Sequence, residues 1–273
     1  MNHERYTLLR ELAAEFHVEH LAIRGEYGLI QGPATDNVIL RWYAMTGVWS
    51  AETNALVAAH LHRGGTFVDV GANLGLTTVP AARLAGVRVE AFEPDPTCYR
   101  HLAANVAANV AEADVVLHNL AAYDRDALVS FEQSTINHGD NRVRVTDAPG
   151  ALGEEGRVVL EVRAARVDDI VRLEGPVAVK VDTQGAEPFV IEGARETLAR
   201  AGLVCLEYWP YGMRRQDADA RVVHEWLRQF PAVGVRSETG AVEELAYAAA
   251  LARLEALDAA DPESYVDVIV RRA

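Results

Sequence analysis

The second quarter of the chain alternates between short apolar runs, typical of buried strands, and longer segments whose apolar residues recur at helical spacing. The runs predict strands at 66–70, 87–92 and 114–119, with helices at 74–85 and 96–109. The same alternation returns later and predicts strands at 177–182, 203–208, 233–237 and 265–271, with helices at 186–200, 216–229 and 241–257. Such a pattern indicates parallel strands joined by right-handed crossovers. We therefore expect an α/β fold with a doubly wound, mostly parallel, seven-stranded Rossmann-like sheet whose last two strands form a hairpin-like pair.

Residues 1–62 precede this pattern and read as an extension of helices and a hairpin. Apolar residues at helical spacing predict a helix over 5–17. Two short strands, Leu21–Arg24 and Leu29–Gln31, should pair across the turn between them, and a helix should run from a cap at Ser50 to about His62.

The alternation is interrupted between residues 123 and 168. Leu128–Gln133 and Val158–Val162 are strand-like, and a polar, glycine-bearing segment separates them. We expect an excursion from the sheet here, not a further βα unit. Because no Pro- or Ser-rich linker marks a boundary, residues 1–273 should form a single domain, with its core at 63–273.

Charge and composition narrow the classes of partner. The chain has 26 Lys and Arg against 40 Asp and Glu, a net charge of −14, which repels nucleic-acid phosphates and anionic lipid. No apolar run approaches a membrane span, no basic leader opens the chain, and Cys98 and Cys205 form no metal-binding spacing. We expect a cytoplasmic protein acting on a small molecule, without nucleic acid or membrane as partner. The sequence leaves a homodimer open.

Candidate chemistry begins where the first strand of the core ends, at Asp69-Val70-Gly71-Ala72-Asn73-Leu74-Gly75. Glycine-rich corners of this kind bind nucleotide ligands, but Asp69 would repel a pyrophosphate and would attract an ammonium or a sulfonium. S-adenosylmethionine carries both cations. We expect Asp69 to orient its methionine portion, directly or through water, with Gly71, Ala72 and Asn73 lining the ligand and Gly75 letting the next helix pack closely.

Glu93, followed by Pro94, ends the next strand 22 residues after Gly71. An acid at this place in nucleoside-binding sheets accepts hydrogen bonds from the ribose hydroxyls. Asn119 ends the third strand, where its amide could meet the adenine edge or could simply serve a turn.

Together with Lys180-Val-Asp-Thr-Gln-Gly-Ala-Glu187, these motifs make the chain similar to FkbM-family class I S-adenosylmethionine-dependent methyltransferases. Supporting motifs are 117–121 and 137–142, so the resemblance spans nearly the whole chain. It implies methyl transfer to a hydroxyl of a sugar or natural product. One departure is Thr183-Gln184, where the family often has Val-Glu, which leaves Asp182 and Glu187 as the acids of that segment.

Lys180 and Asp182 should face the same side of their strand, with Asp182 at its carboxyl end, where ligands of α/β folds gather. They could form a structural ion pair, but we favour Asp182 facing the transferred methyl and the acceptor oxygen, as base or positioning group. His138, with Asp140 close by to hold its tautomer, is the second candidate for a catalytic group. Its alternative is a solvent-exposed loop histidine.

The acceptor should be bound by Asp140, Lys180, Glu187 and the aromatic pair Tyr208-Trp209, although these two aromatic side chains could equally be core packing. No set of side chains predicts a metal site. Two other functions stay open: a nicotinamide-dependent oxidoreductase on the same fold, against which Asp69 argues, and a binding module that retains the cofactor pocket without catalysis.

Overall fold

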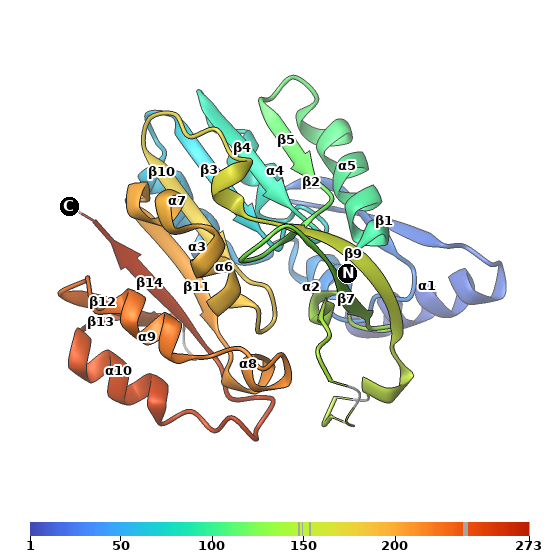
Figure 1. Ribbon diagram of the computed structural model, residues 1–273. Coiled ribbons are helices and arrows are strands. Elements are labelled where there is room, and N and C mark those ends of the chain that lie inside the picture. The colour runs from blue at the N-terminus through green and yellow to red at the C-terminus, as the bar shows by residue number, and fades with distance from the viewer. Residues whose placement is uncertain (147, 149, 153, 237–239, 273) are drawn as a thin grey trace.

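The computed structural model describes residues 1–146, 148, 150–152, 154–236 and 240–272. Its centre is an eight-stranded sheet in the order β13-β12-β14-β11-β10-β3-β4-β5 (Figure 1). The strands are β3 (Gly65–Val70), β4 (Val87–Phe92), β5 (Val115–His118), β10 (Val177–Val181), β11 (Leu203–Tyr208), β12 (Ala232–Arg236), β13 (Val242–Ala246) and β14 (Val266–Arg271). The five strands from β11 to β5 are mutually parallel, whereas β14 is antiparallel to both of its neighbours. The expected doubly wound, mostly parallel α/β sheet is confirmed.

The eighth strand corrects the sequence prediction. Residues 242–246 were assigned to a helix over 241–257, but they pair antiparallel with β12 at the edge of the sheet, and only Tyr247–Glu255 (α10) is helical. The free edge of β12 offers these residues backbone partners that periodicity within the segment cannot reveal. The prediction for Ser237 lies outside the described residues.

Helices cover both faces of the sheet. One apolar core joins the sheet to α3, α4, α5 and the N-terminal extension, and the other joins it to α6, α7, α9 and α10. The remaining bounds are α1 (His3–Glu15), α2 (Ile39–Thr46), α3 (Ala51–His60), α4 (Thr78–Ala82), α5 (Pro96–Val110), α6 (Glu187–Gly193), α7 (Arg195–Arg200), α8 (Pro210–Arg215) and α9 (Arg221–Leu227). Among the described residues, no helix is both long and apolar enough to cross a bilayer.

Several helices differ from their predicted bounds. The helix expected at 74–85 is reduced to α4, because residues 71–77 form a long turn over the end of β3. The helix expected at 186–200 divides into α6 and α7 at Ala194. Neither α2 nor α8 was predicted, and α9 covers only part of 216–229. Ser50 does precede α3, but its side chain makes no capping hydrogen bond.

The two segments outside the main sheet adopt the predicted kinds of structure. Strands β1 (His20–Gly25) and β2 (Gly28–Pro33) form the expected antiparallel hairpin. The excursion forms a separate four-stranded sheet in the order β6-β9-β7-β8, built from β6 (Ala121–Ala122), β7 (Ala127–Gln133), β8 (Arg142–Val143) and β9 (Val158–Ala165). In Figure 1, β7 and β9 lie over the carboxyl edge of the central strands, on the side of the N-terminal helices.

Candidate active site

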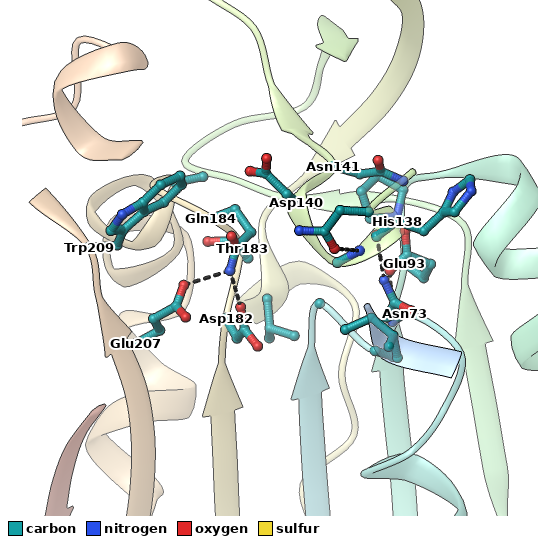
Figure 2. A pocket seen from close by; sticks show the side chains of 18 of the residues that line it. Asn73, Glu93, His138, Asp140, Asn141, Asp182, Thr183, Gln184, Glu207 and Trp209 are labelled. Carbon is teal, nitrogen blue, oxygen red and sulfur yellow. Dashed lines mark hydrogen bonds between the residues drawn. The ribbon is translucent and has the colours of Figure 1, made fainter. Parts of the chain in front are cut away.

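A cavity of about 350 Å³ opens at the carboxyl ends of β3, β4, β10 and β11. Its walls also include Val38, Ile39 and Trp49 from the N-terminal extension and residues 137–141 from the excursion. The carboxyl edge of a parallel sheet is where α/β folds bind ligands, and the volume suits a small molecule. Segments far apart in the sequence therefore enclose one site (Figure 2).

Asp69 does not line this cavity. Its side chain is completely buried, and Oδ2 accepts hydrogen bonds of 2.6 Å from the hydroxyls of both Thr77 and Thr78. The Lys180 ammonium lies 3.6 Å from its other oxygen. The turn that follows β3 folds back over the carboxylate. The two threonine hydroxyls and the Lys180 ammonium therefore surround Asp69 and separate it from the cavity. The expected direct contact of Asp69 with a ligand is therefore corrected: this acid holds the turn in place.

The turn itself lines the cavity through Gly71, Ala72 and Asn73. Gly71 has a φ of 82°, and a Cβ there would overlap the carbonyl oxygen of Asp182. Its lack of a side chain is thus required by the neighbouring strand as well as by any ligand. Asn73, with a φ of 51°, donates from Nδ2 to the carbonyl of His138 at 2.7 Å and so connects the turn to the excursion. Gly75 lies outside the cavity lining and allows Leu102 of α5 to approach, since a Cβ there would be 2.7 Å from Leu102 Cδ1.

Glu93 and Pro94 line the cavity at the end of β4. The Glu93 carboxylate is 5% exposed and accepts hydrogen bonds of 2.8 Å from the backbone N–H groups of Asn73 and Asp95. Burial, and secondarily the charge of Asp95, raises the pKa of Glu93 to about 8. Asn119 is exposed and outside the lining, and its amide donates to the carbonyls of Glu93 and Pro94. The turn interpretation of Asn119 therefore holds, and its predicted adenine contact is corrected.

Lys180 and Asp182 both line the cavity, and they also interact with each other. Lys180 Nζ lies 3.4 Å from Asp182 Oδ2 and donates a 2.7 Å hydrogen bond to the carbonyl of Gly71. Burial lowers the pKa of Lys180, but the charges of Asp182 and Asp69 outweigh it and raise the pKa overall. The Asp182 side chain stays 36% exposed. The structural ion pair is thus present, and it leaves Asp182 open to the cavity.

Two further polar residues of this region were missed from the sequence. Gln184 Nε2 donates to Asp182 Oδ1 at 2.8 Å and to Glu207 Oε2 at 2.6 Å, so that one amide joins two carboxylates (Figure 2). Burial, followed by the charges of Asp182 and Glu187, raises the pKa of Glu207 well above its usual range. The signal available in the sequence was an acid inside the otherwise apolar strand 203–208, which burial would not tolerate without a purpose.

Two of the expected acceptor-binding residues point elsewhere. Glu187 is completely buried and outside the lining, and its Oε1 accepts from the backbone N–H and hydroxyl of Thr183. Burial raises its pKa to about 7. Tyr208 is buried in the apolar core between the sheet and α6, α7, α9 and α10, where its hydroxyl lies 2.8 Å from His224 Nε2. Trp209 alone of the aromatic pair lines the cavity, with its indole N–H donating to the carbonyl of Pro262.

His138 lines the cavity but does not interact with Asp140 as expected. Its Nε2 lies 3.2 Å from the hydroxyl of Thr35, and its backbone N–H donates to Asp36, a completely buried acid that the sequence did not reveal. Burial lowers the pKa of His138, so its ring is neutral near pH 7. The predicted solvent-exposed alternative is wrong, because the side chain is 9% exposed.

Asp140 lines the cavity, yet its carboxylate belongs to a buried cluster of charges. Arg142 Nη1 lies 2.5 Å from Asp140 Oδ1, and Arg157 pairs with its other oxygen. Glu132 and Glu154 complete the cluster by pairing with the same arginines. Because Asp140 is engaged in this way, it cannot hold the tautomer of His138, and that expectation is corrected.

Figure 2 separates the lining residues into two ends. Asn73, Glu93 and His138 lie at one end, above β3 and β4, whereas Asp182, Gln184, Glu207 and Trp209 lie at the other, above β10 and β11. At the first end, the turn at Gly71, Ala72 and Asn73 presents its backbone to the cavity beside the buried carboxylate of Glu93. This arrangement fits the amino-acid and ribose parts of S-adenosylmethionine. The second end exposes the carboxylates of Asp182 and Glu207 to the cavity. The described residues contain no group of three or more His, Cys, Asp or Glu side chains arranged to hold a metal ion.

Comparison with known proteins identifies the family of the chain. The model of the methyltransferase FkbM domain matches residues 69–232. Among curated proteins, the 2-O-methyltransferase NoeI of Sinorhizobium fredii is 28% identical over 187 residues, which cover 61% of this chain and 72% of NoeI. The methyltransferase sdnD of Sordaria araneosa is 29% identical over 188 residues, which cover 58% of this chain and 72% of sdnD.

Solved structures resemble the chain more distantly. The crystal structure of M. jannaschii TYW2 in complex with AdoMet aligns over 93% of this chain and 87% of TYW2, with 12% identity and a TM-score of 0.41. That likeness is too remote to add to the argument. The family match covers more than half of the chain and excludes the nicotinamide-dependent alternative. The chain belongs to the FkbM family of S-adenosylmethionine-dependent methyltransferases.

Proposed function

We propose that the protein transfers a methyl group from S-adenosylmethionine to a hydroxyl of a small, sugar-containing or natural-product acceptor. The observation that carries the proposal is Asp182, an accessible carboxylate in the same cavity as the Gly71 turn and Glu93. The name of the relative NoeI, a 2-O-methyltransferase, supports oxygen as the atom that is methylated.

The cofactor end holds S-adenosylmethionine through main-chain and carboxylate contacts. Gly71, Ala72 and Asn73 present backbone to the amino-acid portion, and Glu93, beside Pro94, receives the ribose hydroxyls. When bound, the cofactor supplies an activated methyl group on a sulfonium. Asp69 acts through the turn that it holds, and its charge adds to the negative potential that favours a cation there.

Asp182 takes the proton of the substrate hydroxyl or orients that hydroxyl for attack on the methyl group. An alcohol becomes a good nucleophile only as its proton leaves, and a positioned carboxylate accelerates such steps about 10²–10⁴-fold. Lys180 and the Gln184 amide each bind one oxygen of Asp182, which fixes the orientation of the carboxylate. Lys180 thus positions Asp182, and Trp209 forms a wall of the acceptor space.

Asp182→Asn tests this role. The amide cannot take a proton, so kcat should fall about 10²–10⁴-fold while the affinity for S-adenosylhomocysteine stays within about threefold. Turnover is measured as S-adenosylhomocysteine released with a panel of glycosides and polyketides, and affinity by calorimetry. Glu112→Gln, which removes an exposed charge before β5 at the opposite edge of the sheet, is the control.

His138→Ala distinguishes the second candidate. His138 lies at the cofactor end and its imidazole is neutral, so it is the alternative group that could take the proton of the acceptor hydroxyl. Full turnover in His138→Ala with loss in Asp182→Asn supports Asp182 as the catalytic carboxylate. Full turnover in Asp182→Asn would reject it.

A further inference from the structure

The acids in and around the cavity differ in how their charges are balanced. Lys180 lies within ion-pair distance of both Asp69 and Asp182, so one cation serves two carboxylates. Asp140 is paired with Arg142 and Arg157. Glu207 is different: within the part of the chain that the structure describes, no Lys, Arg or His nitrogen lies within 4.0 Å of it.

The strand neighbour of Glu207 does not supply that cation either. In the antiparallel pairing of β11 with β14, Glu207 is opposite Asp267, which is a further negative charge. Arg236, the cation on this side, is 2.7 Å from Asp267 and also donates to Thr53. The hydrogen bond that Glu207 receives comes from Gln184, a neutral amide, and it reaches only one of the two carboxylate oxygens.

Glu207 nevertheless lines the cavity beside Asp182. Its side chain is half-buried, and burial together with the charges of Asp182 and Glu187 raises the pKa of Glu207 well above its usual range, although the charge of Lys180 acts in the opposite direction. A positively charged group placed in the cavity would favour the ionised form of Glu207 and lower its pKa. The net charge of −14 acts in the same direction, since it raises the local concentration of cationic small molecules.

We propose that the acceptor carries a positively charged nitrogen next to the hydroxyl that is methylated, and that Glu207 binds this nitrogen. The inference rests on the proposed function, because it takes Asp182 as the group that faces the reacting hydroxyl. Gln184 is then a positioning residue, whose single nitrogen sets the separation of the two carboxylates and so of the hydroxyl and the ammonium. The class of acceptor is an amino alcohol, such as an amino sugar or an aminocyclitol.

A matched pair of probes tests this inference without knowledge of the natural acceptor. The probes are trans-2-aminocyclohexanol, whose alkyl amine is charged at pH 7, and trans-1,2-cyclohexanediol, which has the same ring and is neutral. Their dissociation constants are measured by ligand-detected NMR on the full chain saturated with S-adenosylhomocysteine. We expect the amino alcohol to bind at least about tenfold more tightly, and the ratio to shrink as salt is added.

Glu207→Gln should reduce that ratio to about threefold or less, whereas Glu112→Gln should leave it unchanged. Retention of the thermal shift with S-adenosylhomocysteine shows that the Glu207→Gln variant is folded. If it is not folded, the ratio in the unaltered protein and its dependence on salt still decide the question. Equal affinities for the two probes, including failure of both to bind, would overturn the inference, as would an undiminished ratio in folded Glu207→Gln.

The outcome is separable from that of the proposed function. A preference for the amino alcohol is a binding result and stands whether or not a methyl group is transferred. Mass spectrometry of the probe after incubation with S-adenosylmethionine identifies the methylated atom. Transfer to nitrogen would overturn O-methylation while the preference that depends on Glu207 remains.

Discussion

At the scale of single residues, Asp69 lies in the motif that the sequence predicted, but its side chain stabilises the turn after β3 and does not face the cavity. Asp69 was predicted to orient the ligand directly or through water, but one of its oxygens accepts from two threonine hydroxyls and the other faces Lys180. The threonines lie eight and nine residues further along the chain. Their return to Asp69 depends on how the turn packs, which the spacing of glycines does not reveal.

Asp69→Asn tests the structural role. The amide oxygen can keep both threonine hydrogen bonds, but the amide N–H group replaces the carboxylate oxygen beside the Lys180 ammonium and a buried charge is lost. The free energy of unfolding should therefore fall by about 1–3 kcal/mol. Urea unfolding at pH 7 measures this loss. Asp114→Asn, at an exposed ion pair with Arg88, should change the same free energy by no more than about 0.5 kcal/mol. Similar effects of the two substitutions would contradict a role for Asp69 in stability.

At the scale of elements, the N-terminal extension and the excursion meet over the cofactor end of the cavity. Asp36 accepts from the backbone N–H groups of Val38 and Leu40 at the start of α2, and from the N–H of His138 in the excursion. Asn37 adds a backbone bond to the carbonyl of Ile136. One buried carboxylate thus joins two segments about 100 residues apart.

Asp36→Asn should loosen this junction. The amide group places N–H donors where at least one backbone donor now binds, and a buried unmet donor costs about 1–3 kcal/mol. Hydrogen exchange followed by mass spectrometry should show faster exchange in peptides covering 36–42 and 136–140, and the affinity for S-adenosylhomocysteine should fall. Asp126→Asn, an exposed acid in the turn before β7, is the control. Unchanged exchange in both peptides would show that Asp36 does not hold the segments together.

At the scale of the whole molecule, buried acids make stability depend on pH. The pKa of Glu93 is raised from 4.5 to about 8 by burial and by Asp95. Between these two values the folded protein binds more protons at this site than the unfolded chain, so its contribution to stability is complete below pH 4.5 and is lost as the pH rises toward 8. Glu187, with a pKa of about 7, acts in the same direction up to that pH.

Glu93→Gln should flatten this dependence. One group contributes a slope of at most about 1.4 kcal/mol per pH unit, so the free energy of unfolding of the variant should fall less steeply between pH 5 and 8 than that of the parent. Denaturant unfolding at intervals of half a pH unit measures both slopes, and Glu112→Gln should retain the parent slope. A parent whose stability rises over this range at the same rate as that of Glu93→Gln would show that Glu93 titrates normally.

What the sequence determined by itself is the order of the elements and the position of the site along them. The β3 turn, Glu93 and Asp182 were predicted at the carboxyl edge of a mostly parallel sheet, and the structure has them at that edge. This was possible because apolar periodicity and the glycines of a turn are local properties of the chain, and because parallel strands bring their carboxyl ends together.

Only the tertiary structure decided which side chains face the cavity. Glu187 and Tyr208 were expected to face the cavity, but the first is buried against Thr183 and the second contacts His224 in the apolar core. Glu207 and Asp36, in contrast, have hydrogen-bond partners in segments that are distant in the sequence, namely Gln184 and His138. Residues 242–246 became a strand for the same reason, since β12 offered them a free edge. A polar side chain takes whichever donor, acceptor or charge packing brings within reach, and that choice depends on contacts that are remote in the sequence.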